Sequence, residues 1–99
     1  MAIAIHGRKN DGTDIVWLGG RATELRDAVG SSLHEAGFPA EPNKTLPGEH
    51  EMNICNRTVP GEGVQLELSL SLRQRLMAED ETLETFCMAI RQAIEPVGD

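Results

Sequence analysis

Basic charge, cysteine and long apolar runs are all scarce in this 99-residue sequence. Nine lysines and arginines stand against sixteen aspartates and glutamates, which gives a formal net charge of -7. Non-specific binding to nucleic acid or to an anionic membrane surface needs a basic face, so the acidic balance argues against both. No apolar run approaches the roughly 20 residues of a membrane-spanning helix. The first five residues are apolar but lack a basic segment in front of them, so we expect no signal peptide and a cytoplasmic location.

Only two cysteines occur, Cys55 and Cys87, and nothing near them has the spacing of metal ligands. We expect both to be reduced and structural. The remaining composition, 39% hydrophobic and 25% charged, is that of an ordinary globular protein. A chain of this length has room for one domain at most, so residues 1–99 are expected to form a single domain.

Two short apolar runs predict β-strands near the start of the chain, at residues 2–5 and 15–18. The first run is apolar at every position, which is typical of a strand buried on both faces inside a sheet. We expect the two strands to form a hairpin or to lie side by side. A buried strand needs a neighbour on each side, so the first run also suggests that the chain is part of something larger or associates with another molecule.

Two segments have the spacing of amphipathic helices. Apolar residues recur every three or four positions from 22 to 36, and Gly37-Phe38 is a typical helix stop. A second stripe runs from 81 to 97, with Asp80 as a possible N-cap. The Gly19-Gly20 pair before the first helix suits either a tight turn or an anion site at the helix N-terminus. Strands and helices together predict an α/β fold.

The segment from Val64 to Ser69 has the strict alternation of a strand with one apolar and one polar face. Glu67 lies in the middle of the polar face, between apolar neighbours. A carboxylate held rigidly and partly desolvated on a strand suits a general base. The alternative is an ordinary solvated surface glutamate. Residues 70–75 either extend this strand or wind into a turn.

Three other groups of polar residues are candidates for chemistry. His6 ends the first strand, and clefts of α/β sheets open at strand ends. It is a candidate metal ligand or acid/base. The alternative is a histidine that caps backbone groups. In Asn53–Arg57, the Arg57 guanidinium suits a carboxylate and the asparagines offer amide donors, unless the segment is only a loop held by its own side chains. Glu49-His50-Glu51 is consecutive and therefore better explained as a solvated charge run than as a metal cluster.

Several blocks of this sequence, in the order in which they occur, resemble the poly-γ-glutamate hydrolase family, whose members are also described as phage-related replication proteins. The blocks are Ile3-Ala4-Ile5-His6-Gly7, Trp17-Leu18-Gly19-Gly20, Gly37-Phe38, Asn53-Ile54-Cys55-Asn56-Arg57, Gly63-Val64-Gln65-Leu66-Glu67-Leu68-Ser69 and Leu72-Arg73. The Asn-Ile-Cys-Asn-Arg block and the Gly-Val-Gln-Leu-Glu-Leu block are the specific ones. The resemblance covers almost the whole chain.

The resemblance implies a zinc carboxypeptidase-like fold, with a small mixed β-sheet packed by two main helices, and hydrolysis of γ-glutamyl amide bonds. In such an enzyme zinc polarises the scissile carbonyl and activates a water molecule. By the resemblance, His6 matches one zinc ligand and Glu67 matches the general base. Asn56 with Arg57, and separately Arg73, match positions suited to bind the carboxylates of poly-γ-glutamate or of a γ-glutamyl peptide.

The His-Gly-Gly-Gly-Ile-Glu motif, which provides two zinc ligands in the family, does not occur in this sequence. Catalytic zinc needs about three protein ligands, so the chain resembles the C-terminal half of the domain and is expected to be incomplete or inactive alone. The missing half is then an expected partner. The alternative is a non-catalytic domain that oligomerises through its first strand and binds no metal tightly.

Overall fold

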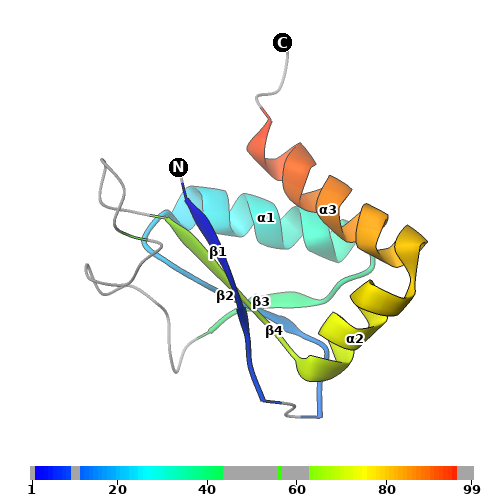
Figure 1. Ribbon diagram of the computed structural model, residues 1–99. Helices are drawn as coiled ribbons and strands as arrows, with labels where there is room; N and C mark the ends of the chain where they lie inside the picture. The colour runs from blue at the N-terminus through cyan, green and yellow to red at the C-terminus, as the bar shows by residue number, and fades with distance from the viewer. Residues whose placement is uncertain (1, 10–11, 44–55, 57–62, 96–99) are drawn as a thin grey trace.

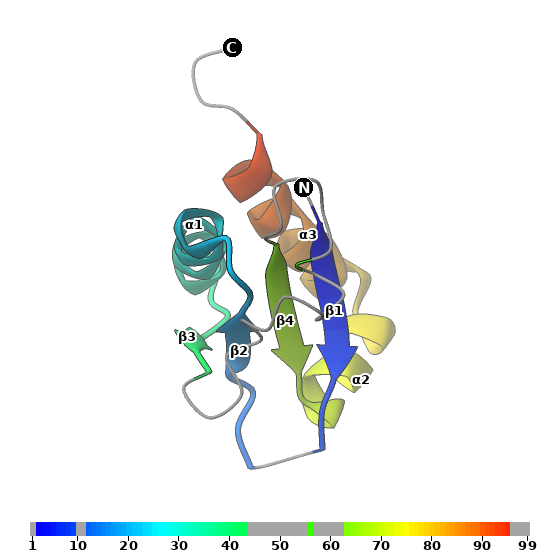
Figure 2. The same ribbon diagram turned by 90° about the vertical axis from the view of Figure 1, so that its left-hand side faces the viewer.

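The computed structural model describes residues 2–9, 12–43, 56 and 63–95 (Figure 1). Along the chain the elements are β1 (Ile3–Gly7), β2 (Val16–Gly19), α1 (Thr23–Glu35), β3 (Ala40–Pro42), β4 (Val64–Leu68), α2 (Leu70–Ala78) and α3 (Asp80–Ile94). The strands form one sheet in the order β1-β4-β2-β3, and the helices cover one of its faces (Figures 1 and 2). None of the helices within these residues is long and apolar enough to cross a membrane.

The sheet is mixed, because β4 runs parallel to β1 but antiparallel to β2, and β2 runs parallel to β3. The predicted α/β fold with a small mixed sheet is therefore confirmed. The expected pairing of the first two strands is wrong, since β4 lies between β1 and β2. An apolar run shows that a strand can be buried, but it does not say which strand lies beside it.

The first strand is also not in the interior of the sheet. β1 is an edge strand, and its burial falls along its length until the Ile5 side chain is 57% exposed. Ile3 packs against the core, whereas nothing among the described residues covers Ile5 to the same degree. The prediction of a strand buried on both faces is therefore wrong for the chain as it stands.

β4 is one of the two inner strands, and its predicted alternation is confirmed. Val64, Leu66 and Leu68 are at most 3% exposed and form the middle of the core beneath the helices. The opposite face of the strand is also largely covered, because Gln65 is 6% exposed and Glu67 is half-buried. A residue on this second face is consequently held in a fixed position by neighbours on both sides.

The helix predicted over residues 22–36 is α1, and it ends as expected. Gly37 has a φ of 95°, and its N–H donates to the carbonyl of His34 while the N–H of Phe38 donates to that of Leu33 at 2.8 Å. These two bonds satisfy the last carbonyls of the helix. They also turn Phe38 into the core, where its ring meets that of Phe86 edge-on at 5.1 Å.

The Gly19-Gly20 turn brings the start of α1 against β4. Gly20 has a φ of 101°, and a Cβ atom there would lie 2.2 Å from the carbonyl oxygen of Gly63. That same oxygen accepts a hydrogen bond from the N–H of Ala22 at 3.0 Å. The glycine therefore permits a close backbone contact, which is the tight-turn interpretation of the pair.

Helix α2 was missed by the sequence analysis, which expected a strand extension or a turn and only two main helices. Ser69 ends β4 and caps the helix, because its hydroxyl accepts the N–H of Leu72 at 3.1 Å. The carboxylate of Asp14 accepts the hydroxyls of Ser69 and Ser71 and lies 3.5 Å from Arg75. The hydrogen bonds from Ser71 and Ser69 hold the pKa of Asp14 below its usual value, with a smaller contribution from Arg75.

The C-terminal helix is confirmed as α3, with a different start. Its N-cap is Glu79 and not Asp80, and no side chain caps it. Phe86 of the predicted stripe is buried, whereas Cys87 of the same stripe is exposed and free. Ala89, which was not predicted to belong to the stripe, is also buried. Cys55 and Val97 lie outside the described residues.

Candidate active site

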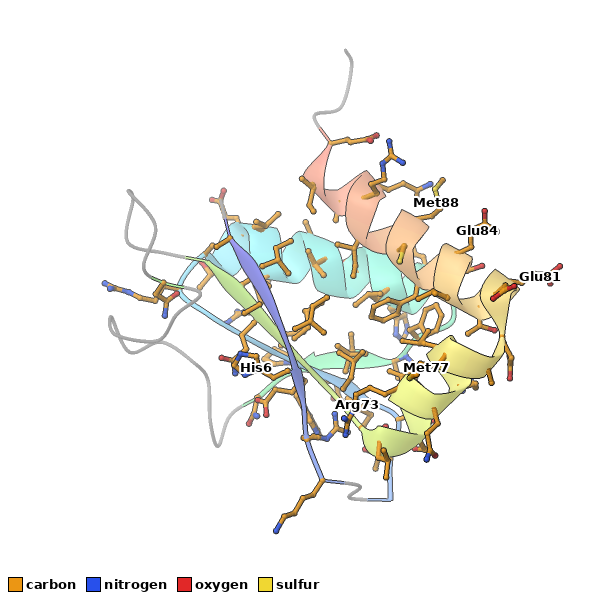
Figure 3. All side chains as sticks on the ribbon, viewed as in Figure 1. His6, Arg73, Met77, Glu81, Glu84 and Met88 are labelled. Carbon is orange, nitrogen blue, oxygen red and sulfur yellow. The ribbon has the colours of Figure 1, made fainter. Side chains whose placement is uncertain are left out.

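His6 and Glu67 lie opposite each other on adjacent strands. They are register partners in the parallel β1–β4 pair, and Trp17 is the partner of Glu67 in the β2–β4 pair. Side chains of paired residues project from the same face of a sheet. His6, Glu67 and Trp17 therefore share the face opposite the helices, and Figure 3 shows His6 on that side of β1. The register thus brings two of the predicted site residues to one face of the sheet, and their roles stay a prediction.

The carboxylate of Glu67 is oriented by two side-chain amides. Asn43, just after β3, donates from Nδ2 to Oε1 of Glu67 at 2.9 Å. Gln65 donates from Nε2 to the same oxygen at 3.4 Å, which is long for a hydrogen bond of this kind. Both side-chain amides therefore donate to the same oxygen of the carboxyl group. The carboxylate is thus fixed in direction by groups that carry no charge.

Arg8 adds a cation to the same face. Its guanidinium donates from Nη1 to the backbone carbonyl of Glu67 at 2.7 Å and lies 5.7 Å from the centre of the Trp17 ring. Its backbone N–H also donates to the carbonyl of Leu68 at 2.9 Å. Arg8 therefore clamps the ends of β1 and β4 together and brings positive charge next to Glu67.

Arg73 lies on the other side of β1. Its guanidinium donates to the carbonyls of Arg8, at 3.1 Å, and Ser69, at 3.4 Å. It packs where a Cβ atom of Gly7 would be, and Gly7 faces the helices because it follows His6 in the pleat. Figure 3 places His6 and Arg73 on opposite sides of the strand. The structure does not bring Arg73 onto the face of His6 and Glu67, and its role in substrate binding stays a prediction.

Asn56 is buried and holds backbone in place. Its Oδ1 accepts the N–H of Arg21 at 2.9 Å and that of Gly63 at 3.1 Å. The side chain is 2% exposed and links the turn before α1 to the start of β4. This is the interpretation of a loop tied down by its own side chains, and the substrate role of Asn56 stays a prediction. Arg57 and the Glu49-His50-Glu51 run lie outside the described residues.

A zinc ion would find one predicted ligand on this face. Within the described part of the chain, no three histidine, cysteine, aspartate or glutamate side chains are grouped as metal ligands. His6 is exposed at the sheet edge and Glu67 is the expected base. Catalytic zinc needs about three protein ligands, so the described residues do not fit zinc on their own.

Three residues that lie beside Glu67 were not predicted as site residues from the sequence: Arg8, Trp17 and Asn43. The alternation in β2 contained a signal for Trp17, because Val16 and Leu18 are core residues and the residue between them must face the other way. Arg8 follows His6 by two positions and so continues its face. Nothing in the local sequence marks Asn43, which reaches Glu67 only because β3 pairs with β2.

Comparison with known proteins decides the family. A family model described as poly-gamma-glutamate hydrolase matches residues 1–87. The chain belongs to the poly-γ-glutamate hydrolase family. A curated relative, the SPbeta prophage-derived UPF0714 protein YoqZ of Bacillus subtilis strain 168, is 32% identical over 98 residues, which cover 96% of this chain and 33% of YoqZ.

Two solved structures share the fold. A bacteriophage poly-gamma-glutamate hydrolase superposes with a TM-score of 0.83 at 32% identity, over 92% of this chain and 50% of that one. A structure described as YNDL-apo (Zinc-free) has a TM-score of 0.68 at 27% identity, over 75% of this chain and 38% of that one. The chain therefore spans a third to a half of the length of these three proteins.

Proposed function

We propose that this chain is the part of a poly-γ-glutamate hydrolase that carries the general base and one zinc ligand. The observation that supports this most directly is the register of His6 with Glu67, which puts an imidazole and a carboxylate side by side on the sheet face opposite the helices. In this proposal residues 1–99 correspond to the C-terminal half of a hydrolase domain. A structural neighbour described as zinc-free is consistent with a metal in the family.

In the proposed reaction Glu67 accepts a proton from the attacking water and returns it to the leaving amine. Asn43 and Gln65 donate hydrogen bonds to one carboxylate oxygen of Glu67. The rigid strand sets the direction of the other oxygen. General base catalysis of this kind contributes roughly 10²–10⁴-fold to a rate. Zinc, when bound by His6 and by donors that the described residues do not contain, would supply Lewis acidity.

The proposed substrate is a polymer of γ-linked glutamate, whose free α-carboxylates are anionic. The net charge of -7 opposes such a polymer at long range, so attraction has to come from cations in the site itself. Arg57 with Asn56, and Arg73, are the proposed carboxylate-binding residues. Arg8 lies on the right face for a further contribution, beside Trp17 and Glu67.

The test combines this chain with the remaining half of a family hydrolase and zinc, and measures cleavage of poly-γ-glutamate. Glu67→Gln should lower the rate by about 100-fold or more, since it removes the base and little volume. Glu41→Gln is the matched control, because Glu41 is the register partner of Trp17 and lies on the same face but is exposed. Full activity of the Glu67→Gln enzyme would show that the base is elsewhere.

A second candidate function, a non-catalytic interaction domain, is favoured by the exposed edge strand β1. Calorimetric titration of the chain alone with zinc separates the two candidates. Micromolar or tighter binding at one site, lost in His6→Ala, would support a metal site retained in this chain. Absence of heat would support the interaction domain.

A further inference from the structure

Trp17 lies directly beside the proposed general base, on the sheet face opposite the helices. It is the register partner of Glu67 in the β2–β4 pair, and paired residues of neighbouring strands lie about 5 Å apart. Its chain neighbours Val16 and Leu18 are at most 3% exposed in the core, so the pleat directs the indole to the other face. A group that reacts at Glu67 therefore has an aromatic side chain next to it.

Arg8 holds the indole in place on this face. Its guanidinium lies 5.7 Å from the centre of the Trp17 ring and donates from Nη1 to the backbone carbonyl of Glu67 at 2.7 Å. Nη2 also donates to the carbonyl of Thr13 at 3.3 Å, before β2 begins. One side chain thus joins β4 to the start of β2 and contacts the ring between them. The cation–π contact restrains the ring, which gives a preformed apolar surface beside the base.

The position of Trp17 sets it apart from the other aromatic residues. The chain contains two phenylalanines, no tyrosine and this single tryptophan. Phe38 and Phe86 are buried in the core, where their rings meet edge-on. Trp17 is half-buried and lies outside that core. Gly19, the next residue of β2 on the same face, has no side chain to cover the indole. The largest aromatic side chain of the protein is therefore placed at the site and contributes nothing to the core.

The two linkages that glutamate can form differ in what lies next to the amide. In a γ-linked chain, the amide carbonyl is bonded to two methylenes in a row, and the carboxylate is carried by the α-carbon that follows them. In an α-linked chain, the carbonyl is bonded to the α-carbon, and the two methylenes belong to a side chain that ends in the carboxylate. An uncharged pair of methylenes beside the scissile amide is therefore specific to the γ linkage. It is also the part of the substrate that an indole can cover favourably.

We infer that Trp17 selects γ-linked over α-linked glutamate by packing against the chain methylenes beside the scissile amide. The inference rests on the proposed function, because it takes Glu67 as the base and γ-linked glutamate as the substrate. The Glu67 carboxylate repels the carboxylates of either polymer, so an uncharged segment is favoured next to it. The charge of Arg8 at the ring favours a carboxylate a short distance further along the chain.

The size of the effect follows from the apolar area covered. Each methylene removed from water contributes about four-fold to affinity, so two methylenes on the indole contribute roughly ten-fold. The contact is made in the bound substrate and in the transition state alike. Its loss should therefore raise KM and leave kcat nearly unchanged.

The test compares γ-linked with α-linked tetraglutamate, two isomers of equal charge. Because Trp17 is the only tryptophan, fluorotryptophan incorporated into the 99-residue chain gives a single fluorine NMR signal. The chain is titrated alone and in a mixture with the remaining half of the phage hydrolase, without zinc, so that cleavage does not interfere. We expect the γ isomer to shift the signal and to bind about ten-fold more tightly than the α isomer.

Three variants separate the contact from a general effect on the protein. Trp17→Leu should weaken binding of the γ isomer about ten-fold and leave the α isomer unchanged in a calorimetric titration. Trp17→Phe keeps a ring and should stay within about three-fold of the parent chain. Leu83→Ala is the matched control, because Leu83 is an exposed apolar residue of α3, on the helix side of the sheet. In the zinc enzyme, Trp17→Leu should raise KM for poly-γ-glutamate about ten-fold and change kcat by less than about two-fold.

Equal affinity of the parent chain for the two isomers would overturn the inference, and so would a fluorine signal that neither preparation shifts with the γ isomer. It would also fail if Trp17→Leu kept the preference of the parent chain. Failure of the proposed function gives a different result. The zinc enzyme would then leave poly-γ-glutamate uncleaved, whereas the isomer preference at Trp17 would still be measured, because it is recorded without zinc.

Discussion

Removing the Asn56 amide should destabilise the fold strongly, although the residue was predicted to bind substrate. In Asn56→Ala the N–H groups of Arg21 and Gly63 lose their acceptor. The Gly63 bond is buried and the Arg21 bond is partly buried. A buried donor left without a partner costs about 1–3 kcal/mol and a partly hydrated one less, so the sum is roughly 2–4 kcal/mol. That is a large share of the about 5–15 kcal/mol that stabilises a small domain.

Urea denaturation followed by circular dichroism measures this loss. With a slope of about 1.3 kcal/mol per molar urea, typical for a small protein, the midpoint should fall by about 1.5–3 M. Asn43→Ala is the matched control, because Asn43 is only half-buried and its partner Glu67 can turn to water. Its midpoint should fall by less than about 0.8 M, which corresponds to roughly 1 kcal/mol.

Equal midpoints for Asn56→Ala and the parent chain would refute the structural role and leave substrate binding as the reason for this residue. The expected result has a practical consequence. Loss of activity in Asn56→Ala would not identify a substrate contact, because the variant loses the fold at the same time. Arg57, Arg73 and Arg8 are better positions at which to test carboxylate binding.

Two further perturbations follow from the backbone and from Asp14. Gly20→Ala should lower the free energy of unfolding by more than about 3 kcal/mol, because it combines a left-handed φ of 101° with a Cβ atom 2.2 Å from the Gly63 oxygen. Gly12 has a φ of 85° and open space around it, so Gly12→Ala should lower it by only about 1–2 kcal/mol in the same denaturation measurement. The lowered pKa of Asp14 stabilises the fold above its unfolded pKa of about 3.9, and this contribution is lost as the pH falls through the lower folded value. Because the Asp14 side chain is 37% exposed, Asp14→Asn should reduce stability at pH 7 by only about 1 kcal/mol. The variant should also lose less stability than the parent chain below about pH 4. The same pH dependence in the variant and the parent chain would contradict this.

The elements that sequence reasoning predicted well are those whose own residues determine them. The alternation at Val64, Leu66 and Leu68 is visible without knowing what covers the strand, and the same residues form the middle of the core. The end of α1 is likewise local, because a left-handed glycine followed by an apolar residue closes the last turn whatever lies beyond it. Local physics of this kind needs no long-range contact to be recognised.

The errors concern features that depend on distant residues. β1 was placed in the sheet interior because its residues are apolar, but whether a strand is an edge strand depends on which other strands are present. Helix α2 was missed because its stripe is short and its start depends on Ser69, whose hydroxyl is shared between the N–H of Leu72 and the carboxylate of Asp14 55 residues away. A pattern within ten residues does not contain that second partner.

The site shows the same division. His6 and Glu67 were found through resemblance, and their shared face follows from the register of two strands almost 60 positions apart. Asn43 was not found, because nothing in the local sequence marks it. It reaches Glu67 at 2.9 Å only through the pairing of β3 with β2, which the sequence does not reveal.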